Sequence, residues 1–266
     1  MRKLVVLLFG VFSITISAQE NHRTSDFNLH PKTETVERTE YVFNLDTNAK
    51  EVGSVITMTF YNTYLQTVYK DYGSSQLKST YHYNIDNLLV EIREEDLTAQ
   101  TENKILYQYK KGQLVKKNEF ISGRLFSETN YAYDKTGRLQ KAVEKETGNA
   151  NIVVTLCSNY TTAGKYKVVT TDYSGTKIVQ QQTEQYADGL LLSGIYEMFD
   201  LKTNTTFLYD EKRNLISEQN EKEAPTTYRY EYDAMGNPVN IVIANMTDDF
   251  RSKEICIKNT YSDFRN

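Results

Sequence analysis

The sequence predicts an all-β protein: an antiparallel meander of repeated hairpins, curled or rolled into a half-barrel or a solenoid-like sheet. Three observations support this fold class. A tyrosine precedes a tight turn seven times, these tyrosines follow one another at steps of 26, 24, 27, 26, 23 and 23 residues, and no segment carries a sustained helical period. The seven anchor tyrosines are Tyr83, Tyr109, Tyr133, Tyr160, Tyr186, Tyr209 and Tyr232.

The clearest unit reads Tyr-Ala-Tyr-Asp-Lys-Thr-Gly-Arg-Leu and contains the anchor Tyr133. Asp134 is typical of the first position of a type I turn, and Gly137 can adopt the left-handed conformation that closes a three-residue hairpin with a bulge. If Asp134 pairs with Arg138, Tyr133 lies directly opposite Leu139 on the same face of the sheet. This cross-strand pair is the expected contact of each unit.

Two units have a turn that is one residue shorter. Lys111-Gly112 and Asp188-Gly189 read as two-residue hairpin loops, and Asp-Gly is a strong signal for such a turn. The shorter loop still places a tyrosine opposite a leucine, so two turn lengths preserve one pairing. The expected pairs are Tyr109 with Leu114 and Tyr186 with Leu191.

The remaining units depart from the pattern in the turn or in the leucine position. Asn87 can replace glycine because asparagine tolerates positive φ, and the unit of Tyr209 lacks the glycine. Proline in the leucine position breaks a ladder hydrogen bond and indicates an edge or a bulge. The expected pairs here are Tyr83 with Leu89, Tyr160 with Tyr166, Tyr209 with Leu215 and Tyr232 with Pro238.

Second turn signals lie between the anchors, at Ser122-Gly123, residues 147–149, Ser174-Gly175 and residues 221–225. Each unit therefore reads as strand, tight turn, strand and looser turn. Chained together, the units predict an antiparallel meander of about fourteen or more strands.

The units around Tyr133 and Tyr232 resemble the YD repeat of RHS-type proteins, whose signature is Y-x-Y-D-x-x-G-R/N. The resemblance extends over about residues 60–245, strong in these two copies and partial elsewhere. It implies β-hairpin units in a curled or spiralling sheet of a secreted or cell-surface bacterial protein, implicated in carbohydrate binding or in enclosing a toxin. Seven or so units are too few to enclose a toxic domain. The repeat residues are structural, so no catalytic residue is carried over.

Residues 1–18 are typical of a secretory signal peptide. A basic start, Arg2-Lys3, precedes an apolar run that ends at a small residue and is too short to span a membrane as a helix. A disordered polar segment, residues 19–39, is expected next, followed by the repeat domain, residues 40–266. The protein is therefore expected in the periplasm or outside the cell, without a transmembrane segment after signal cleavage.

The net charge limits the classes of partner that we expect, and the positions of the cysteines bear on whether a disulfide forms. Without Arg2 and Lys3 the chain carries 29 basic against 35 acidic residues, a net charge of −6. Nucleic acid requires a concentrated basic face, so we expect no nucleic-acid partner. Cys157 and Cys256 are the two cysteines, and in a meander they lie several hairpins apart, which favours two separate thiols over a disulfide.

No residue pattern predicts catalysis, a metal site or a cofactor. His22 and His30 fall in the N-terminal segment, and His82 faces away from the tyrosines with no second ligand at metal spacing. The acidic runs at 94–96 and 248–249 lack the spacing of a calcium loop, and acidic residues are common in turns. No nucleophile elbow, phosphate loop or dinucleotide fingerprint is present. The sequence therefore predicts that the protein is not an enzyme.

The 21 tyrosines, in a chain without tryptophan, carry the functional signal. Aromatic rings stack on sugars and their hydroxyls supply hydrogen bonds, so Tyr228, Tyr230 and Tyr232 are candidate binding residues for an envelope glycan or a protein partner. The competing interpretation is that the rings pack on the opposing leucines as core. An apolar sheet face must also close, dimerise or hold a ligand. The second hypothesis is therefore a periplasmic carrier that holds a lipid or another apolar ligand in a rolled sheet.

Overall fold

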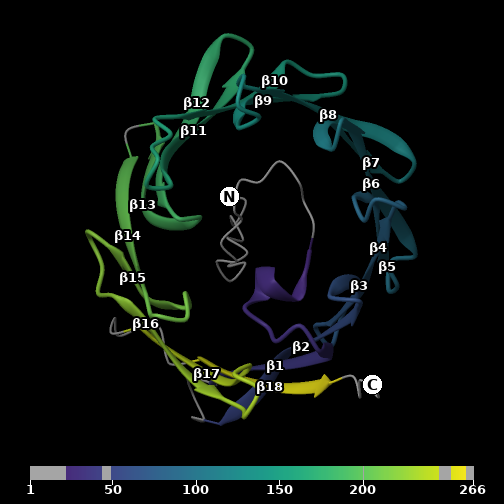
Figure 1. The fold of residues 1–266 in the computed structure, drawn as a ribbon, viewed down its shortest axis with the longest axis vertical. Helices are drawn as coiled ribbons and strands as arrows, with labels where there is room; N and C mark the ends of the chain where they lie inside the picture. The colour runs from purple at the N-terminus through teal and green to yellow at the C-terminus, as the bar shows by residue number, and fades with distance from the viewer. Residues whose placement is uncertain (1–21, 44–48, 200, 246–252, 262–266) are drawn as a thin grey trace.

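A computed structural model describes residues 22–43, 49–199, 201–245 and 253–261, which form an 18-stranded antiparallel sheet and one short 3-10 helix. Each strand pairs with its neighbours in the chain, and β1 also pairs with β18. The meander therefore closes into a complete ring (Figure 1). The elements are η1 (Thr24–Phe27), β1 (Thr33–Phe43), β2 (Lys50–Tyr61), β3 (Tyr64–Asp71), β4 (Gln76–Tyr83), β5 (Leu89–Asp96), β6 (Thr101–Lys110), β7 (Gln113–Ile121), β8 (Arg124–Tyr133), β9 (Leu139–Glu146), β10 (Asn151–Ser158), β11 (Lys165–Ser174), β12 (Lys177–Ala187), β13 (Leu190–Met198), β14 (Leu201–Tyr209), β15 (Leu215–Asn220), β16 (Thr226–Tyr232), β17 (Pro238–Asn245) and β18 (Lys253–Tyr261).

The complete ring confirms the antiparallel meander and corrects the expectation of a half-barrel or solenoid-like sheet. Closure pairs the two sheet edges, whose backbone groups would otherwise face water or another chain. The sequence gives no signal for closure because β1 begins inside the polar segment 19–39 that reads as disordered. The described part of that segment, residues 22–39, instead forms η1 and most of β1. Strands β2 and β18 supply backbone hydrogen bonds that its composition does not reveal.

The face of the sheet that carries the anchor tyrosines points into the ring. Phe27 and Leu29 pack on the face of β1–β3 that carries Val36, Met58 and Leu65. Because η1 lies inside the ring (Figure 1), this face is the lumen side. Directly opposed residues on neighbouring strands share a face, so the register of the pairs traces the lumen side around the whole ring. The anchor tyrosines on the strands and their leucine partners lie on it.

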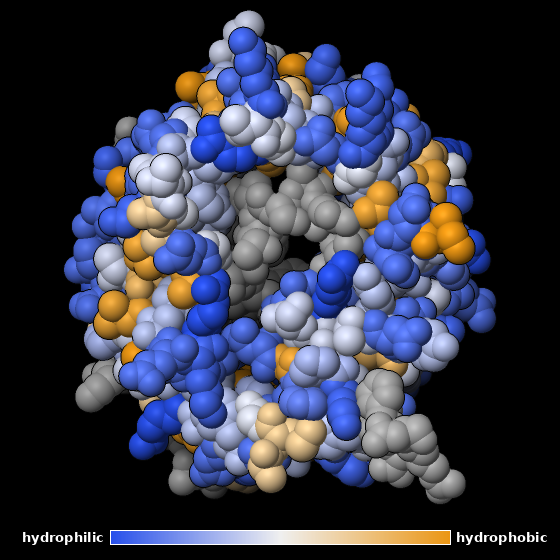
Figure 2. Space-filling view, viewed as in Figure 1, coloured by the Kyte–Doolittle hydropathy of each residue, from blue (hydrophilic) through white to orange (hydrophobic). Residues whose placement is uncertain are grey.

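The outer side of the ring is polar. The same register places charged or amide side chains outward in the strands. Figure 2, which looks onto the end of the ring, shows hydrophilic residues over most of that end. Hydrophobic residues are scattered between them, as is usual on protein surfaces. Outward polar residues include Arg93, Lys104, Asn118, Glu128, Lys141, Lys167 and Arg229.

The tight turns have the predicted geometry. The amide of Asp134 donates to the carbonyl of Arg138 over 2.9 Å, and Gly137 has a φ of 84°. Tyr133 lies opposite Leu139, just after a β-bulge. The same pairing, with a bulge before the tyrosine, recurs around the ring and confirms the predicted pairs. They are Tyr83 with Leu89, Tyr109 with Leu114, Tyr186 with Leu191, Tyr209 with Leu215 and Tyr232 with Pro238.

The first residue of the three-residue turns holds the turn with its own side chain. The Asp134 carboxylate accepts hydrogen bonds from the amides of Thr136 (2.8 Å) and Arg138 (3.0 Å). Hydrogen bonds from the Thr136 side chain and from the Arg138 backbone hold the pKa of Asp134 well below its usual range. Asp210 accepts in the same way from the amide of Asn214, over 2.8 Å. The aspartate of the repeat is therefore explained by turn structure.

The tyrosine hydroxyls connect consecutive hairpins, a feature absent from the sequence prediction. The Tyr133 hydroxyl donates to the backbone carbonyl of Leu114, in the preceding hairpin, over 2.6 Å. Ladder pairing between β7 and β8 stops at Lys116, so the hydroxyl satisfies a carbonyl that the neighbouring strand does not reach. Four other bonds follow the same rule: Tyr83 to Leu65, Tyr160 to Leu139, Tyr209 to Leu191 and Tyr230 to Leu215.

The units of Tyr160 and Tyr186 differ from the others in how their tyrosine rings are paired. Tyr160 follows the end of β10, so it meets Tyr166 by ring stacking, with centroids 5.4 Å apart, instead of ladder pairing. Tyr166 in turn pairs with Tyr186 in the ladder, and their rings are parallel within 2° at 4.9 Å. Tyr160 also keeps its hydroxyl bond to Leu139, so the stacking of Tyr166 on Tyr186 is an additional, aromatic contact between consecutive hairpins.

Asn237, a fully buried side chain in the β16–β17 turn, joins the two ends of the described chain. Its amide nitrogen donates to the hydroxyl of Thr33 (2.8 Å), where β1 begins, and to that of Tyr261 (2.9 Å), where β18 ends. Its carbonyl oxygen accepts from the backbone of His30 over 2.5 Å. One turn of the repeat therefore supports the closing seam of the ring.

The two cysteines are free thiols, as the strand separation favours. Cys157 on β10 is buried on the lumen side, opposite Val168, whereas Cys256 on β18 faces outward between two lumen-facing isoleucines. Among the described residues, no helix is long and apolar enough to cross a membrane. The expected signal peptide, residues 1–18, lies outside the described residues.

Candidate functional site

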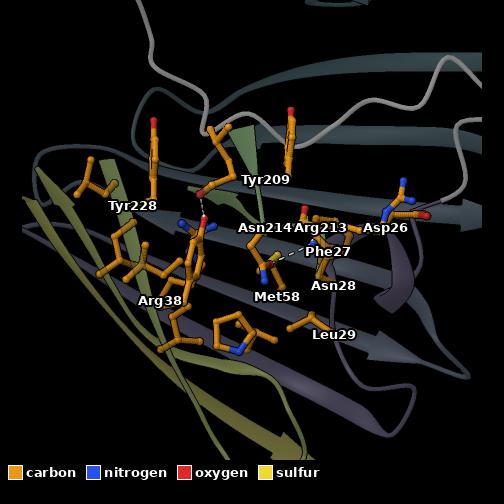
Figure 3. A pocket seen from close by; sticks show the side chains of 18 residues that line it. Asp26, Phe27, Asn28, Leu29, Arg38, Met58, Tyr209, Arg213, Asn214 and Tyr228 are labelled. Carbon is orange, nitrogen blue, oxygen red and sulfur yellow. Dashed lines mark hydrogen bonds between the residues drawn. The ribbon is translucent and has the colours of Figure 1, made fainter. Parts of the chain in front are cut away.

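A cavity of about 160 Å³ lies in the lumen, between the wall of the ring and the N-terminal segment. We call residues 22–32, which run through η1 to the start of β1, the strap. Figure 3 shows strap residues Asp26, Phe27, Asn28 and Leu29 on one side of the cavity and Arg38 and Tyr228 on the other. The remaining lining residues are Val36, Met58, Tyr209, Arg213, Asn214, Leu215, Tyr230, Pro238, Ile241, Ile243, Ile255 and Ile257.

Four isoleucines form the apolar wall of the cavity. Ile241 and Ile243 on β17, and Ile255 and Ile257 on β18, are two residues apart, so all four point to the lumen. Ile241 lies directly opposite Ile255. Branched side chains in cross-strand contact give this wall a fixed shape, which suits recognition of an apolar group.

Arg38 brings a positive charge into this apolar region. It lies on β1, opposite Ile257 of β18 and Ile56 of β2, and its side chain is half-buried. Desolvation lowers the pKa of the guanidinium, while the charges of Glu40 and Tyr230 act in the opposite direction. Glu40 also forms an ion pair with Lys253, at 3.2 Å. Arginine remains charged at neutral pH, so the cavity contains a cation.

The three cavity tyrosines use their hydroxyl protons within the protein. Tyr209 donates to Leu191 and Tyr230 to Leu215, both at backbone carbonyls. Tyr228 donates to the Glu218 carboxylate over 3.2 Å. Burial raises the pKa of each phenol, that of Tyr230 to about 12, although the charge of Arg38 acts to lower it. The tyrosines thus line the cavity, and their hydroxyl protons are used within the protein.

The strap is held to the wall by contacts at several points. The backbone amide of Thr24 donates to the backbone carbonyl of Thr63, which lies in the β2–β3 turn, over 2.8 Å. Phe27 meets Phe60 edge-to-face, with ring centroids 5.7 Å apart. The Asn28 side chain donates to that of Asn214 over 3.2 Å. These contacts fix the strap as the inner boundary of the cavity.

Two further charged groups line the cavity and are already bound within the protein. The Asp26 carboxylate accepts from the backbone of Arg23 over 2.7 Å. Arg213 takes the left-handed turn position that the sequence shows without glycine, with a φ of 69°. Its guanidinium donates to the carbonyl of Asp188 over 2.5 Å. Both groups are therefore held toward the wall and the strap.

Two of the three predicted binding residues, Tyr228 and Tyr230, line the cavity, and Tyr232 does not. The Tyr232 hydroxyl bonds the side chains of Asp210 (3.2 Å) and Asn214 (2.7 Å) beside the next turn, which is a structural role. Of the other repeat anchors, Tyr209 is the one that lines the cavity.

Sequence reasoning missed Arg38, the four isoleucines and the strap. The alternation Val36-Glu37-Arg38 does carry a signal, because it places a cation on the same strand face as a buried valine. The alternation Ile241-Val242-Ile243 likewise marks a strand face. Neither pattern shows that the strap, Tyr228 and β1 meet, because that contact depends on ring closure.

Within the described ranges, no group of three histidine, cysteine, aspartate or glutamate side chains is placed to hold a metal ion. His82 lies outward on β4, opposite Glu91. His30 is part of the strap, and its Nδ1 accepts from the backbone of Lys32 over 3.1 Å. The cavity lining combines the charged groups Arg38, Arg213 and Asp26 with tyrosine rings and an aliphatic wall.

No family model matches the chain, and no curated protein matches it. A solved porin-like protein from Bacteroides uniformis is similar over 87% of this chain and 98% of its own, with 12% identity and a TM-score of 0.50. The crystal structure of TcdB2-TccC3-Cdc42 aligns over 82% of this chain and 14% of its own, with 14% identity and a TM-score of 0.28, a likeness too weak to carry an argument. The first similarity shows a shared β-barrel fold, and at this identity it says nothing of activity.

Proposed function

We propose that the protein is a non-catalytic binding protein that holds a small, largely apolar ligand in the lumen of its closed barrel. The observation that carries this proposal is the cavity itself, which joins a four-isoleucine wall to Arg38 and to Tyr228 and Tyr230. Ligand sites are typically concave, mostly apolar and supplied with a few fixed polar groups. The proposal follows the carrier hypothesis, in which a rolled sheet encloses an apolar ligand.

The glycan hypothesis has less support because the tyrosines lie inside the ring. Stacking on a sugar needs an accessible ring face, whereas Tyr228 and Tyr230 are half-buried. The Tyr230 ring already stacks on Tyr232, at 6.2 Å and 21°. Their hydroxyl protons are given to Glu218 and Leu215, so few donors remain for sugar hydroxyls. Recognition of a large envelope glycan would have to use another surface.

The outer surface supports function in an aqueous compartment. A barrel that spans a lipid bilayer needs an outward apolar band about 25 Å tall, and an outward Lys or Arg at its middle costs about 2–4 kcal/mol. Arg93, Lys141 and Arg229 occupy outward positions within β5, β9 and β16. We therefore propose that this barrel works outside the bilayer, in the periplasm or beyond the cell, which is where a signal peptide at residues 1–18 would send it.

Methyl NMR of isoleucine-labelled protein tests the proposal. Hexanol is added to the protein purified without detergent, after mass spectrometry under native and denaturing conditions has identified any co-purified ligand. The expected result is a saturable shift of the methyl signals of Ile241, Ile243 and Ile255, with no change at the outward Ile152 and Ile195. If hexanol and hexanoate both leave the cavity methyls unchanged, and no ligand co-purifies, the proposed function is wrong.

A further inference from the structure

We propose that the cavity takes a ligand whose apolar part is no larger than a single ring or a chain of about six carbons, and that Leu29 of the strap sets this limit. This inference rests on the proposed function, names the size class of its ligand and assigns a specificity-determining residue. It depends on the volume of the cavity, on the packing at one of its ends and on the way in which the strap is held.

The volume of the cavity determines the size class of the ligand. It measures about 160 Å³, and an apolar cavity of about 150 Å³ in another protein binds benzene. Each methylene group that leaves water strengthens binding by about fourfold, as long as the cavity has room for it. A group that finds no room stays in water or displaces protein side chains, so the gain ends there. The affinity for an alkyl chain should therefore rise with chain length and then stop rising.

One end of the cavity is closed by packed side chains. Leu29 and Ile257 pack against the buried cluster that contains Val36 and Met58, and all four residues line the cavity (Figure 3). The isoleucine wall reaches this cluster through Ile257. A chain that lies along the wall toward Ile257 therefore ends against Leu29.

The wall is fixed by its backbone, whereas Leu29 meets it through a side chain. Strands β17, β18 and β1 are paired by backbone hydrogen bonds along the wall. In the strap, the amide of Leu29 donates to the carbonyl of Thr24 over 2.9 Å, so this part of the backbone is bonded within the strap itself. A shorter side chain at position 29 therefore lengthens the cavity and removes no hydrogen bond between the strap and the wall.

A series of primary alcohols tests the size limit with the full chain. Butanol, hexanol and octanol are titrated separately, and their affinities are read from the methyl shifts of Ile243 and Ile255. Hexanol should bind about 15-fold more tightly than butanol, as expected for two buried methylene groups, and octanol should bind no more tightly than hexanol. A second increase of the same factor from hexanol to octanol would overturn the size limit and leave the binding function intact. If none of the three alcohols binds, the proposed function is itself wrong.

The Leu29→Ala variant locates the limit. It removes most of an aliphatic side chain from the closed end of the cavity, so octanol should bind this variant at least about fourfold more tightly than hexanol. Leu156→Ala is the matched control, because Leu156 is 46% exposed on the outward face of β10, and it should keep the native order of affinities. Equal affinities for hexanol and octanol in a folded Leu29→Ala variant would overturn the assignment of Leu29. The series on the native protein decides the size class even if Leu29→Ala does not fold.

Discussion

At the scale of single residues, the repeat requires tyrosine because its hydroxyl is a structural donor. The ring fills the lumen side beside a leucine, and the hydroxyl reaches a backbone carbonyl of the preceding hairpin. Phenylalanine would keep the packing and lose the bond.

Tyr133→Phe should lower the free energy of unfolding by about 1–3 kcal/mol, because the Leu114 carbonyl loses its 2.6 Å partner in a partly buried place. Urea denaturation followed by circular dichroism measures the change. Tyr61→Phe is the matched control, since its ring is 69% exposed, and it should change stability by less than about 0.5 kcal/mol. Equal stability of the Tyr133→Phe and Tyr61→Phe variants would argue against a structural hydroxyl.

The buried phenols predict a loss of stability in alkali. Burial raises the pKa of Tyr133 and of Tyr230 to about 12 in the folded protein, against about 10 in an unfolded chain. A raised folded pKa gives stability that is complete below pH about 10 and is lost as the pH rises toward 12. The urea midpoint should therefore be constant from neutral pH to about pH 9 and then fall, together with the appearance of tyrosinate absorbance. A midpoint that stays constant to pH 12 would contradict this account.

At the scale of elements, the hairpin turns show what the sequence can predict. The turns could be predicted from the sequence because turn chemistry is local. The residues that show this are Asp134, Gly137 and the two-residue loops, and each fixes the register of its own hairpin. The contacts between consecutive hairpins could not be predicted from the sequence. They depend on hydroxyl-to-carbonyl bonds and ring stacking between residues about 20 positions apart, and no local pattern encodes them.

The β2–β3 turn offers an element-scale prediction. Its two-residue loop, Asn62-Thr63, holds the β-branched Thr63 at a φ of 71°, whereas the equivalent Lys111-Gly112 loop places glycine at 78°. Thr63→Gly should therefore stabilise the protein by about 0.5–1 kcal/mol, and Gly112→Thr should destabilise it. Thermal unfolding of the two variants measures whether each change raises or lowers the stability. A stability loss in Thr63→Gly would show that the turn carries no strain.

At the scale of the whole molecule, closure creates the candidate site. The wall isoleucines belong to the last two strands, Arg38 belongs to the first, and the strap precedes it in the chain. The aromatic stripe made Tyr228 and Tyr230 candidate binding residues, and both line the cavity. The polar composition of residues 19–39, by contrast, gave no indication of the strap or of β1. A site assembled from the two ends of a ring cannot be predicted from local periodicity.

The central claim is therefore the pairing of β1 with β18, and a disulfide across that seam tests it most directly. Thr39 lies opposite the native Cys256 on the outer face, and residues paired in this way have Cα atoms about 4.5–5.5 Å apart, within reach of a disulfide. Thr80→Cys, on the outer face of β4, provides the control.

On mild oxidation of the dilute protein, the Thr39→Cys variant should form an intramolecular disulfide between residues 39 and 256, identified by mass spectrometry of its peptides, and the Thr80→Cys variant should not. Free thiols in the folded, oxidised Thr39→Cys variant would show that the ring is open, and the cavity built across the seam would then not exist.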